Sequence, residues 1–240
     1  MSQNVRVDRK LEMRGAGRNV KGTFNPEKIF REYNFTELAE DTTNWYTEYL
    51  DTTSTIALGA GGLLLTTAAT DTKTCTHTQG GIWWYPTSNI AVEHRFKLDV
   101  VTTVAIFAGF SDAVSEASGL LPHGISTATQ TATATDSAGF LFDTLQTLDY
   151  WNVVSSKTGP TKAFTQLAST YVPVAATNVT LRTEIDSSGN ATYFYNGVQV
   201  GYKALAVTAA TPLIPFFGIR NNSAAAHVAT LRYVRVWADA

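Results

Sequence analysis

The sequence of 240 residues has little charge and almost no cysteine. Charged residues make up 16% of the chain, against about 25% in an average soluble domain, and Thr, Ala and Ser take their place. Uncharged polar surfaces suit solvent exposure or contact with another protein equally well. The one cysteine, Cys75, excludes an intramolecular disulfide, so the fold does not depend on an oxidising compartment.

Long apolar runs are also missing. No apolar stretch reaches the roughly 18 residues that a membrane span requires, and the N-terminus has no apolar run typical of a signal peptide. We therefore expect a protein that is made in the cytoplasm, reaches its site without a secretory signal and has no membrane partner. Apolar residues still make up 44% of the chain and aromatics 11%, which is enough for a full core.

The net charge of −2 hides a strong asymmetry. Residues 1–31 contain eight basic and three acidic residues, a net charge of +5, and the other residues carry −7. Residues 1–34 also have no clean periodicity, which predicts an extended arm that orders against an acidic partner. Its expected partner-binding residues are Val5, Arg6, Val7, Arg9, Lys10, Leu11, Met13, Arg14, Arg18 and Lys21.

The end of this arm carries a helix signal. Asn25 is a possible N-cap, and Pro26 would occupy the first helical position of a short helix that reaches Tyr33. Nucleic acid is not an expected partner of the arm, because acids are mixed with its bases and no aromatic residue precedes Phe24.

The stretch 178–201 organises the rest of the chain. Residues 179–185 alternate apolar and polar side chains with period two, which predicts a half-buried strand. A turn at 186–190 and a second turn at Asn196–Gly197 predict an antiparallel meander of three strands, because a type I′ turn needs positive φ twice. About a dozen such segments predict an all-β domain over residues 35–240, a two-sheet antiparallel β-sandwich.

Other segments are expected as strands or loops by the same reasoning. Strands are predicted near 44–50, 63–67, 80–85, 90–101, 104–110, 138–143, 150–155, 213–220 and 227–237, and polar loops at 66–79, 111–137 and 157–174. The strand at 104–110 is nearly all apolar and should lie in the centre of a sheet.

The C-terminal half resembles the concanavalin A-like lectin/glucanase superfamily, including its laminin-G-like members. The resemblance rests on Glu184-Ile-Asp186, Gly189, the run from Tyr193 to Gly201, Pro215-Phe-Phe-Gly218-Ile-Arg220 and Tyr233-Val-Arg-Val-Trp237. The run from Phe107 to Glu116, with Gly139-Phe-Leu-Phe142-Asp143, is similar to sandwich domains of tailed-bacteriophage structural proteins. The resemblance implies a jelly-roll fold and, with a leading arm, a head-decoration (cement) protein.

The sequence gives little support for a catalytic pair of carboxylates. Glycoside hydrolysis needs two carboxylates about 5–9.5 Å apart, and the Glu-x-Asp-x-x-Glu pattern of the superfamily's glucanases is missing. Glu93 and Asp99 share strand parity but would lie roughly 20 Å apart, and Asp186 of the pair Glu184–Asp186 sits at a turn. Glycoside hydrolase therefore stays a second alternative, and no catalytic residue is predicted.

The histidines and loop carboxylates also have ordinary explanations. His77, His123 and His227 fall in or beside expected polar loops, whereas His94 shares an apolar strand face and is expected in the core. Calcium needs 6–8 oxygen ligands. The pairs that could contribute to such a site are Asp112 with Glu116 and Asp143 with Asp149, although solvated loop carboxylates are the simpler reading. No metal or cofactor is predicted.

Sugar binding remains the first alternative. It needs exposed aromatic rings beside polar groups, and Trp83, Trp84 and Tyr85 are the best candidates for a glycan or interface site. Because Trp83 and Trp84 are adjacent in an expected strand, one of them should face away from the core. The sequence thus favours a non-enzymatic virion protein on the capsid surface, bound to the major capsid protein and to copies of itself, most simply as a homotrimer.

Overall fold

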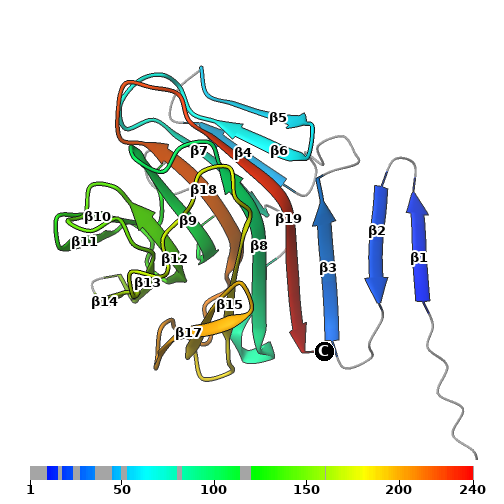
Figure 1. Ribbon diagram of the computed structural model, residues 1–240. Helices are drawn as coiled ribbons and strands as arrows, with labels where there is room; N and C mark the ends of the chain where they lie inside the picture. The colour runs from blue at the N-terminus through cyan, green and yellow to red at the C-terminus, as the bar shows by residue number, and fades with distance from the viewer. Residues whose placement is uncertain are drawn as a thin grey trace, which may run out of the picture.

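The computed structural model describes residues 10–15, 18–23, 28–35, 45–49, 53–79, 83–113, 120–159 and 161–239. Two antiparallel sheets stack face to face and enclose one large apolar core (Figure 1). The chain has the jelly-roll β-sandwich fold of the concanavalin A-like type, as the sequence predicts. No helix in the described part of the chain is long and apolar enough to cross a membrane.

One sheet has seven strands. They are β4 (Trp45–Tyr49), β7 (Thr74–Gln79), β9 (Val104–Ser111), β12 (Ser137–Asp143), β13 (Asn152–Lys157), β14 (Thr161–Gln166) and β18 (Ile214–Asn221). Their spatial order is β14–β13–β12–β9–β18–β7–β4, which places β9 in the centre, as its apolar sequence predicts. Every residue of β9 is buried.

The other sheet has eight strands. They are β3 (Lys28–Asn34), β5 (Thr55–Gly59), β6 (Gly62–Thr66), β8 (Ile90–Leu98), β15 (Val179–Ile185), β16 (Ala191–Tyr195), β17 (Val198–Lys203) and β19 (Val228–Asp239). Seven follow the order β17–β16–β15–β8–β19–β6–β5, and β3 pairs with the C-terminal half of β19. β6 pairs with its N-terminal half.

Two short hairpins and one 3-10 helix complete the described structure. The hairpins are β1 (Lys10–Gly15) with β2 (Arg18–Thr23), and β10 (His123–Ser126) with β11 (Thr129–Ala132), and the helix η1 spans Pro86–Ser88. β1 and β2 belong to neither large sheet, and Figure 1 shows them beyond β3 at the edge of the sandwich. The β1–β2 hairpin is thus a two-stranded sheet of its own, with β2 beside β3.

The meander β15–β16–β17 forms as the sequence predicts. Alternate residues of β15 are buried in the core, beginning with Val179. Asn196 and Gly197 adopt φ values of 48° and 83°, the double positive φ of a type I′ turn. Gly189 in the preceding turn has φ of 80°. Local turn chemistry and the period-two pattern were sufficient to determine this part of the fold.

The helix expected at residues 26–33 is absent, and Lys28–Asn34 forms the strand β3 instead. Its ladder to β19 runs from Lys28 opposite Asp239 to Asn34 opposite Tyr233. Pairing with β19 provides hydrogen bonds to the backbone N–H and C=O groups of β3. These interactions outweigh the local preference for a helix that Asn25 and Pro26 indicate. The sandwich therefore begins inside the segment that was expected to be arm, before residue 35.

Three expected loops contain strands. The stretch 66–79 includes the fully buried β7, residues 111–137 include the β10–β11 hairpin, and residues 157–174 include β14. Threonine accounts for much of this error, because its branched side chain favours strands although its hydroxyl looks loop-like in a sequence. The expected strand at 80–85 is a single bridge between Trp84 and Leu213 in the described residues.

Candidate functional site

The seven-stranded sheet has an outer face, turned away from the other sheet. A separate apolar cluster covers this face, made of Ala105, Phe107, Leu121, Ile125, Leu141, Val154 and Phe216. Leu121 and Ile125 come from the chain around β10, so the expected loop folds back over the sheet. The middle of the face is thus packed with apolar side chains.

Carboxylates are nearly absent from this sheet. Its strands β7, β9, β12, β13, β14 and β18 contain one acidic residue among them, Asp143 at the end of β12. A glycosidase needs a pair of carboxyl groups at a defined separation. These six strands therefore provide no such pair.

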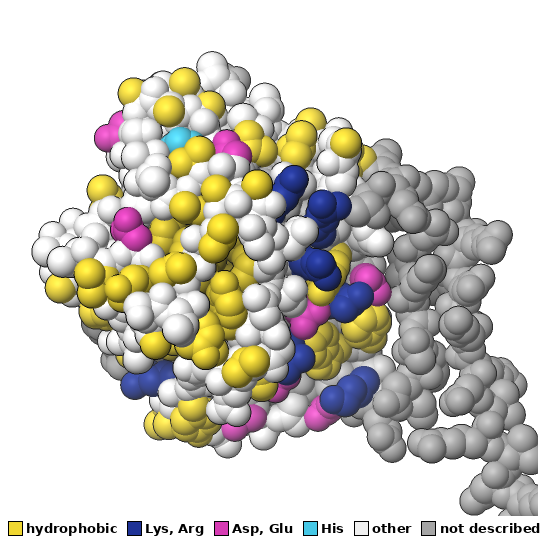
Figure 2. All heavy atoms as spheres, in the orientation of Figure 1, with side chains coloured by type: hydrophobic (Ala, Val, Ile, Leu, Met, Phe, Trp, Pro, Cys, Tyr) yellow, Lys and Arg dark blue, Asp and Glu magenta, His cyan; other side chains and the backbone are white. Residues whose placement is uncertain are grey.

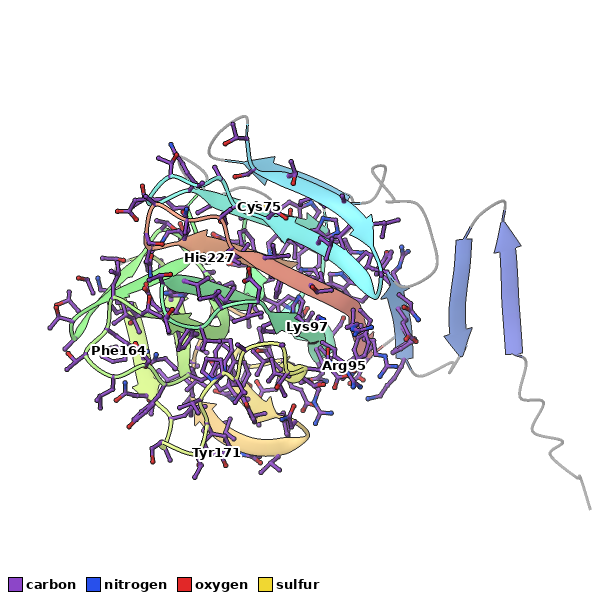
Figure 3. All side chains as sticks on the ribbon, turned by 45° about the horizontal axis from the view of Figure 1, so that its top comes forward. Cys75, Arg95, Lys97, Phe164, Tyr171 and His227 are labelled. Atoms are coloured by element: carbon purple, nitrogen blue, oxygen red, sulfur yellow. The ribbon has the colours of Figure 1, made fainter. Side chains whose placement is uncertain are left out.

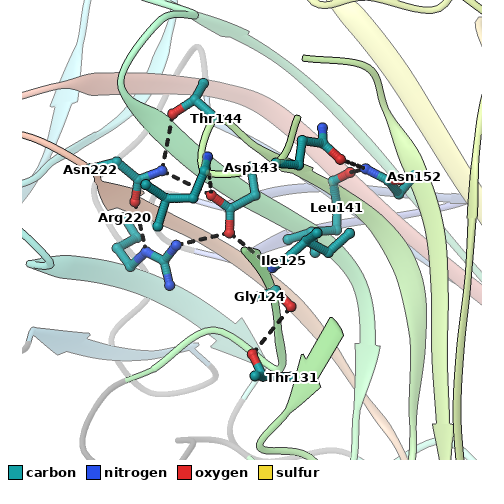
Figure 4. Close-up of polar contacts among 11 residues, drawn as sticks. Gly124, Ile125, Thr131, Leu141, Asp143, Thr144, Asn152, Arg220 and Asn222 are labelled. Carbon is teal, nitrogen blue, oxygen red and sulfur yellow. Dashed lines mark hydrogen bonds and ion pairs between the residues drawn. The ribbon is translucent and has the colours of Figure 1, made fainter. Parts of the chain in front are cut away.

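Asp143 is fully buried and bound on all sides (Figure 4). Its Oδ2 accepts hydrogen bonds from the Ile125 backbone N–H at 3.1 Å and from Arg220 Nη2 at 2.9 Å. Its Oδ1 accepts from the Leu145 backbone N–H at 3.1 Å and from Asn222 Nδ2 at 2.9 Å. The carboxylate thus joins the β10–β11 hairpin to β18 and to the turn after β12, and its contacts are those of a structural clamp.

The sequence offers Asp149 as a possible partner of Asp143 in a loop calcium site. Burial and the charge of Asp143 raise the pKa of the Asp149 carboxyl. Glu116 lies outside the described residues, and Asp112, its expected partner, has a raised pKa because of burial. No three His, Cys, Asp or Glu side chains of the described chain gather as a metal-binding group.

His123, the first residue of β10, belongs to a buried chain of hydrogen-bonded side chains that links the β10–β11 hairpin to the seven-stranded sheet. Gln130 Nε2 donates to His123 Nδ1 at 3.0 Å, and His123 Nε2 lies 2.6 Å from Ser137 Oγ. Ser137 Oγ lies 2.9 Å from Ser156 Oγ. Because the amide occupies Nδ1, the proton sits on Nε2, so this imidazole cannot accept a proton from Ser137. The arrangement lacks both the free base and the carboxylate of a catalytic triad.

All four histidines are buried, against the expectation that three lie at polar loops. His77 and His94 lie in the core on β7 and β8, where burial lowers the pKa of each to about 3, helped at His94 by the charge of His77. Burial likewise lowers the pKa of His123 to about 3, with a smaller contribution from Lys162. Cys75 is buried beside them.

Of the three candidate aromatics, two face out and one faces in. Trp83 and Tyr85 are 41% and 50% exposed, whereas Trp84 is 5% exposed. Trp84 Nε1 donates to Gln79 Oε1 at 2.8 Å, and Gln79 Nε2 donates to Tyr33 Oη at 2.8 Å. This confirms that the adjacent tryptophans face opposite ways, and it leaves Trp83 and Tyr85 on the surface.

The outer face of the eight-stranded sheet carries an ion network centred on Glu93. Its Oε1 accepts hydrogen bonds from Tyr233 Oη at 2.9 Å and from Arg235 Nη1 at 3.4 Å. Its Oε2 lies 3.9 Å from Arg182 Nη1. Arg182 and Arg235 pair further with Glu184 and Glu32, at 3.0 Å and 3.1 Å. Glu93 and Glu184 therefore serve as partners of arginines.

The two remaining acids that sequence reasoning considered sit in turns. Asp99 Oδ1 accepts from the backbone N–H of Val100 at 2.8 Å, directly after β8. Asp186 accepts from the backbone of Ser188 and from Asn190, and so closes the turn between β15 and β16. Both carboxylates are thus engaged by the backbone of their own turns.

Of the expected arm residues, four lie outside the described residues and six lie in the β1–β2 hairpin. Val5, Arg6, Val7 and Arg9 form the first group, and Lys10, Leu11, Met13, Arg14, Arg18 and Lys21 form the second. The ladder places Glu12 opposite Lys21 and Met13 opposite Val20. Residues 10–15 and 18–23 thus form paired strands where the sequence predicts an extended arm.

Comparison with known proteins supports the fold but does not assign a function. No family model and no curated protein matches the sequence. Among solved structures, the carbohydrate recognition domain of Emp47p matches with a TM-score of 0.61 and 10% identity, over 91% of this chain and 100% of that one. LamA from Z. galactanivorans, in complex with laminaritriose and laminaritetraose, matches with a TM-score of 0.62 and 10% identity over 88% and 98%.

A third match is the kappa-carrageenase from Pseudoalteromonas carrageenovora, with a TM-score of 0.55 and 10% identity over 90% of this chain and 98% of that one. Lectin domains and glycoside hydrolases thus share this architecture. The class that the fold defines is the concanavalin A-like lectin/glucanase jelly roll. Function has to be argued from the residues of this chain, because identity this low shows the fold alone.

Proposed function

We propose that this chain is a non-enzymatic structural protein of a tailed-phage particle, which decorates and stabilises the major capsid protein lattice from the capsid surface. The observation that carries the proposal is the β1–β2 hairpin, which belongs to the basic N-terminal segment and lies outside both sheets. An isolated two-stranded hairpin is marginally stable in water. A partner surface of acidic character would supply the missing contacts.

The proposed mechanism is multivalent binding, in which many weak contacts together stabilise the lattice. Each copy would place its N-terminal segment across a joint of the lattice, and copies would cluster, most simply as trimers, at local three-fold positions. Linked copies bind with an effective concentration that raises overall avidity far above the affinity of one contact. The apolar cluster on the outer face of the seven-stranded sheet, and the single acidic residue in the six strands β7, β9, β12, β13, β14 and β18, are compatible with a role without catalysis.

Deleting residues 1–27 is expected to abolish binding to capsids while the sandwich stays folded. The deletion stops before Lys28 because β3 pairs with β19, so a longer deletion would also damage the sheet. Co-sedimentation with capsids of the phage that encodes the chain, at near-physiological salt, measures the binding. The full chain is the positive control, and an unchanged melting temperature of the truncated chain shows an intact fold. Binding that survives the deletion would defeat the proposal.

A second candidate function is glycan binding through Trp83 and Tyr85. Tyr85 is in extended backbone conformation, with φ of −99° and ψ of 126°, and residues two apart in an extended segment point the same way. The backbone of Trp84 between them is held by two hydrogen bonds to Leu213, each of 2.8 Å. Two exposed rings on a fixed segment form a platform on which a sugar ring can stack.

Trp83→Ala is expected to weaken glycan binding about tenfold, since a lost ring contact of this kind is worth about 1–1.5 kcal/mol. A glycan array followed by titration of the best hit measures the loss. Phe164→Ala is the matched control, because Phe164 is an aromatic residue with 39% exposure on the edge strand β14, four strands away from β18 in the seven-stranded sheet. An array on which the full chain binds no glycan would end this candidate.

A further inference from the structure

A bulge in β19 brings an extra cation to the outer face of the eight-stranded sheet. The register between β19 and β8 shifts between Leu231 and Tyr233. Leu231 and Val234 are both fully buried in the core, so the two residues between them, Arg232 and Tyr233, share the outer face. A regular strand would have turned one of them inward.

Two cations of β8 lie beside this bulge. Arg95 pairs in register with Tyr233, and Lys97 pairs with Thr230, so the extra residue Arg232 falls between these two positions. Figure 3 shows Arg95 and Lys97 close together on the sandwich, and Figure 2 shows Lys and Arg side chains gathered in a strip on this side of the molecule. We call Arg95, Lys97 and Arg232 the bulge triad.

The bulge triad is without acidic partners. None of its members forms an ion pair in the described chain, and none has a further interaction beyond those described above. Arg232 Nε is buried without a hydrogen-bond partner, and its guanidinium lies against the turn at Gly61. Of the acids on or next to β8, Glu93 already binds Arg182, Arg235 and Tyr233, and Asp99 accepts a hydrogen bond from the Val100 backbone. Arg95, Lys97 and Arg232 thus place three positive charges on one sheet face without an ion pair in the described chain.

We propose that the bulge triad is a second contact site for carboxylates of an acidic protein surface. The proposal rests on the proposed function and extends it, because the N-terminal segment and the bulge triad would then grip the same partner. β3 connects the two: β2 lies beside β3, and Phe35, next to the end of β3, donates its backbone N–H to the Arg232 carbonyl at 3.0 Å. A partner held by the N-terminal hairpin would therefore have to reach across β3 and β19 to contact Arg95 and Lys97.

The pattern of charge favours a protein partner over a nucleic acid. The acids Glu32, Glu93, Glu184 and Asp239 are interspersed with the cations of this face. A continuous phosphate chain would meet them at close range and be repelled. A protein surface can place a few carboxylates opposite the triad and leave neutral groups opposite the acids.

The test uses the full chain and a model acidic polypeptide, poly-L-glutamate. The double variant Arg95→Gln, Lys97→Gln is expected to bind it about tenfold more weakly at low salt, since each exposed ion contact contributes about 0.2–1 kcal/mol. The control Lys157→Gln, Lys203→Gln removes the same charge from β13 and β17, near the other edge of the sandwich. Calorimetric titration gives the affinities, and the difference between the variants should shrink as salt rises.

The outcomes separate this inference from the proposed function. Equal poly-L-glutamate affinity of the two double variants would overturn the bulge triad as a carboxylate site, whatever the chain does on capsids. A stronger loss on single-stranded DNA of equal charge than on poly-L-glutamate would also overturn it and favour nucleic acid. If the triad variant loses poly-L-glutamate binding and the deletion of residues 1–27 leaves capsid binding intact, the site stands and the proposed function fails.

Discussion

Lowering the pH from 7 to 5 is expected to remove about 6 kcal/mol of folding free energy, about 2 kcal/mol for each of three histidines. Burial lowers the pKa of His77, His94 and His123 to about 3 in the folded protein. The unfolded chain binds these protons near the ordinary histidine pKa of about 6.5. The contribution of these histidines to stability is therefore full above pH 6.5, falls as the pH drops below it, and stops falling near pH 3.

Because small domains are stable by only about 5–15 kcal/mol, this loss should bring the protein close to unfolding at pH 5. Urea denaturation at several pH values gives the free energy of unfolding, and its slope near pH 5 should correspond to nearly three protons bound on unfolding. His123→Gln removes one of the three titrating groups, so its slope should be about two-thirds as steep. A free energy of unfolding that stays constant from pH 7 to 5 would contradict the prediction.

Asp143→Ala is expected to destabilise the protein by about 3–5 kcal/mol, since it leaves a mostly buried charge without its partner. The Arg220 side chain is only 14% exposed and forms its ion pair with Asp143 at 2.9 Å. The change also leaves the backbone N–H groups of Ile125 and Leu145 without their acceptor. Denaturant unfolding at neutral pH measures the loss.

Asp149→Asn is the matched control, a nearby carboxylate whose own pKa is raised by burial and by the charge of Asp143. Removing it relieves repulsion, so its effect should be neutral or slightly stabilising. The double variant Asp143→Asn, Arg220→Met should recover much of the loss, because a buried pair replaced as a whole costs little. A double variant as unstable as Asp143→Ala would show that packing, and not charge, dominates at this point.

The hydrogen-bond partners of Asp143 could not be predicted from the sequence. Asp143 was visible in the sequence as a possible calcium ligand, but its partners Arg220 and Asn222 lie 77 and 79 positions away. Only the pairing of β9 with both β12 and β18 brings these segments to one place. A contact made by such distant segments has no local signature, and neither do the buried positions of His77 and His123.

The bulge triad escaped sequence reasoning for a similar reason. Alternation along β8 places Arg95 and Lys97 on its polar face, but a period-two pattern cannot predict an extra residue in the neighbouring strand. The shift after Leu231 moves Arg232 onto that face beside them. Trp83 and Trp84 form the opposite case, since their adjacency alone required one of them to point outward, and the exposed fractions of 41% and 5% confirm it.

The sequence by itself determined the features that depend on neighbours in the chain: the meander from β15 to β17, the type I′ turn at Asn196, the buried strand β9 and the two-sheet class. Strand periodicity and turn geometry are local, so they can be recognised one segment at a time. The tertiary structure alone decided that residues 28–34 join β19 as a strand, that the β10–β11 hairpin covers part of the seven-stranded sheet, and that Arg232 shares a sheet face with Arg95 and Lys97. Each of these depends on a partner far along the chain, because backbone pairing and charge compensation are satisfied in space and not in sequence.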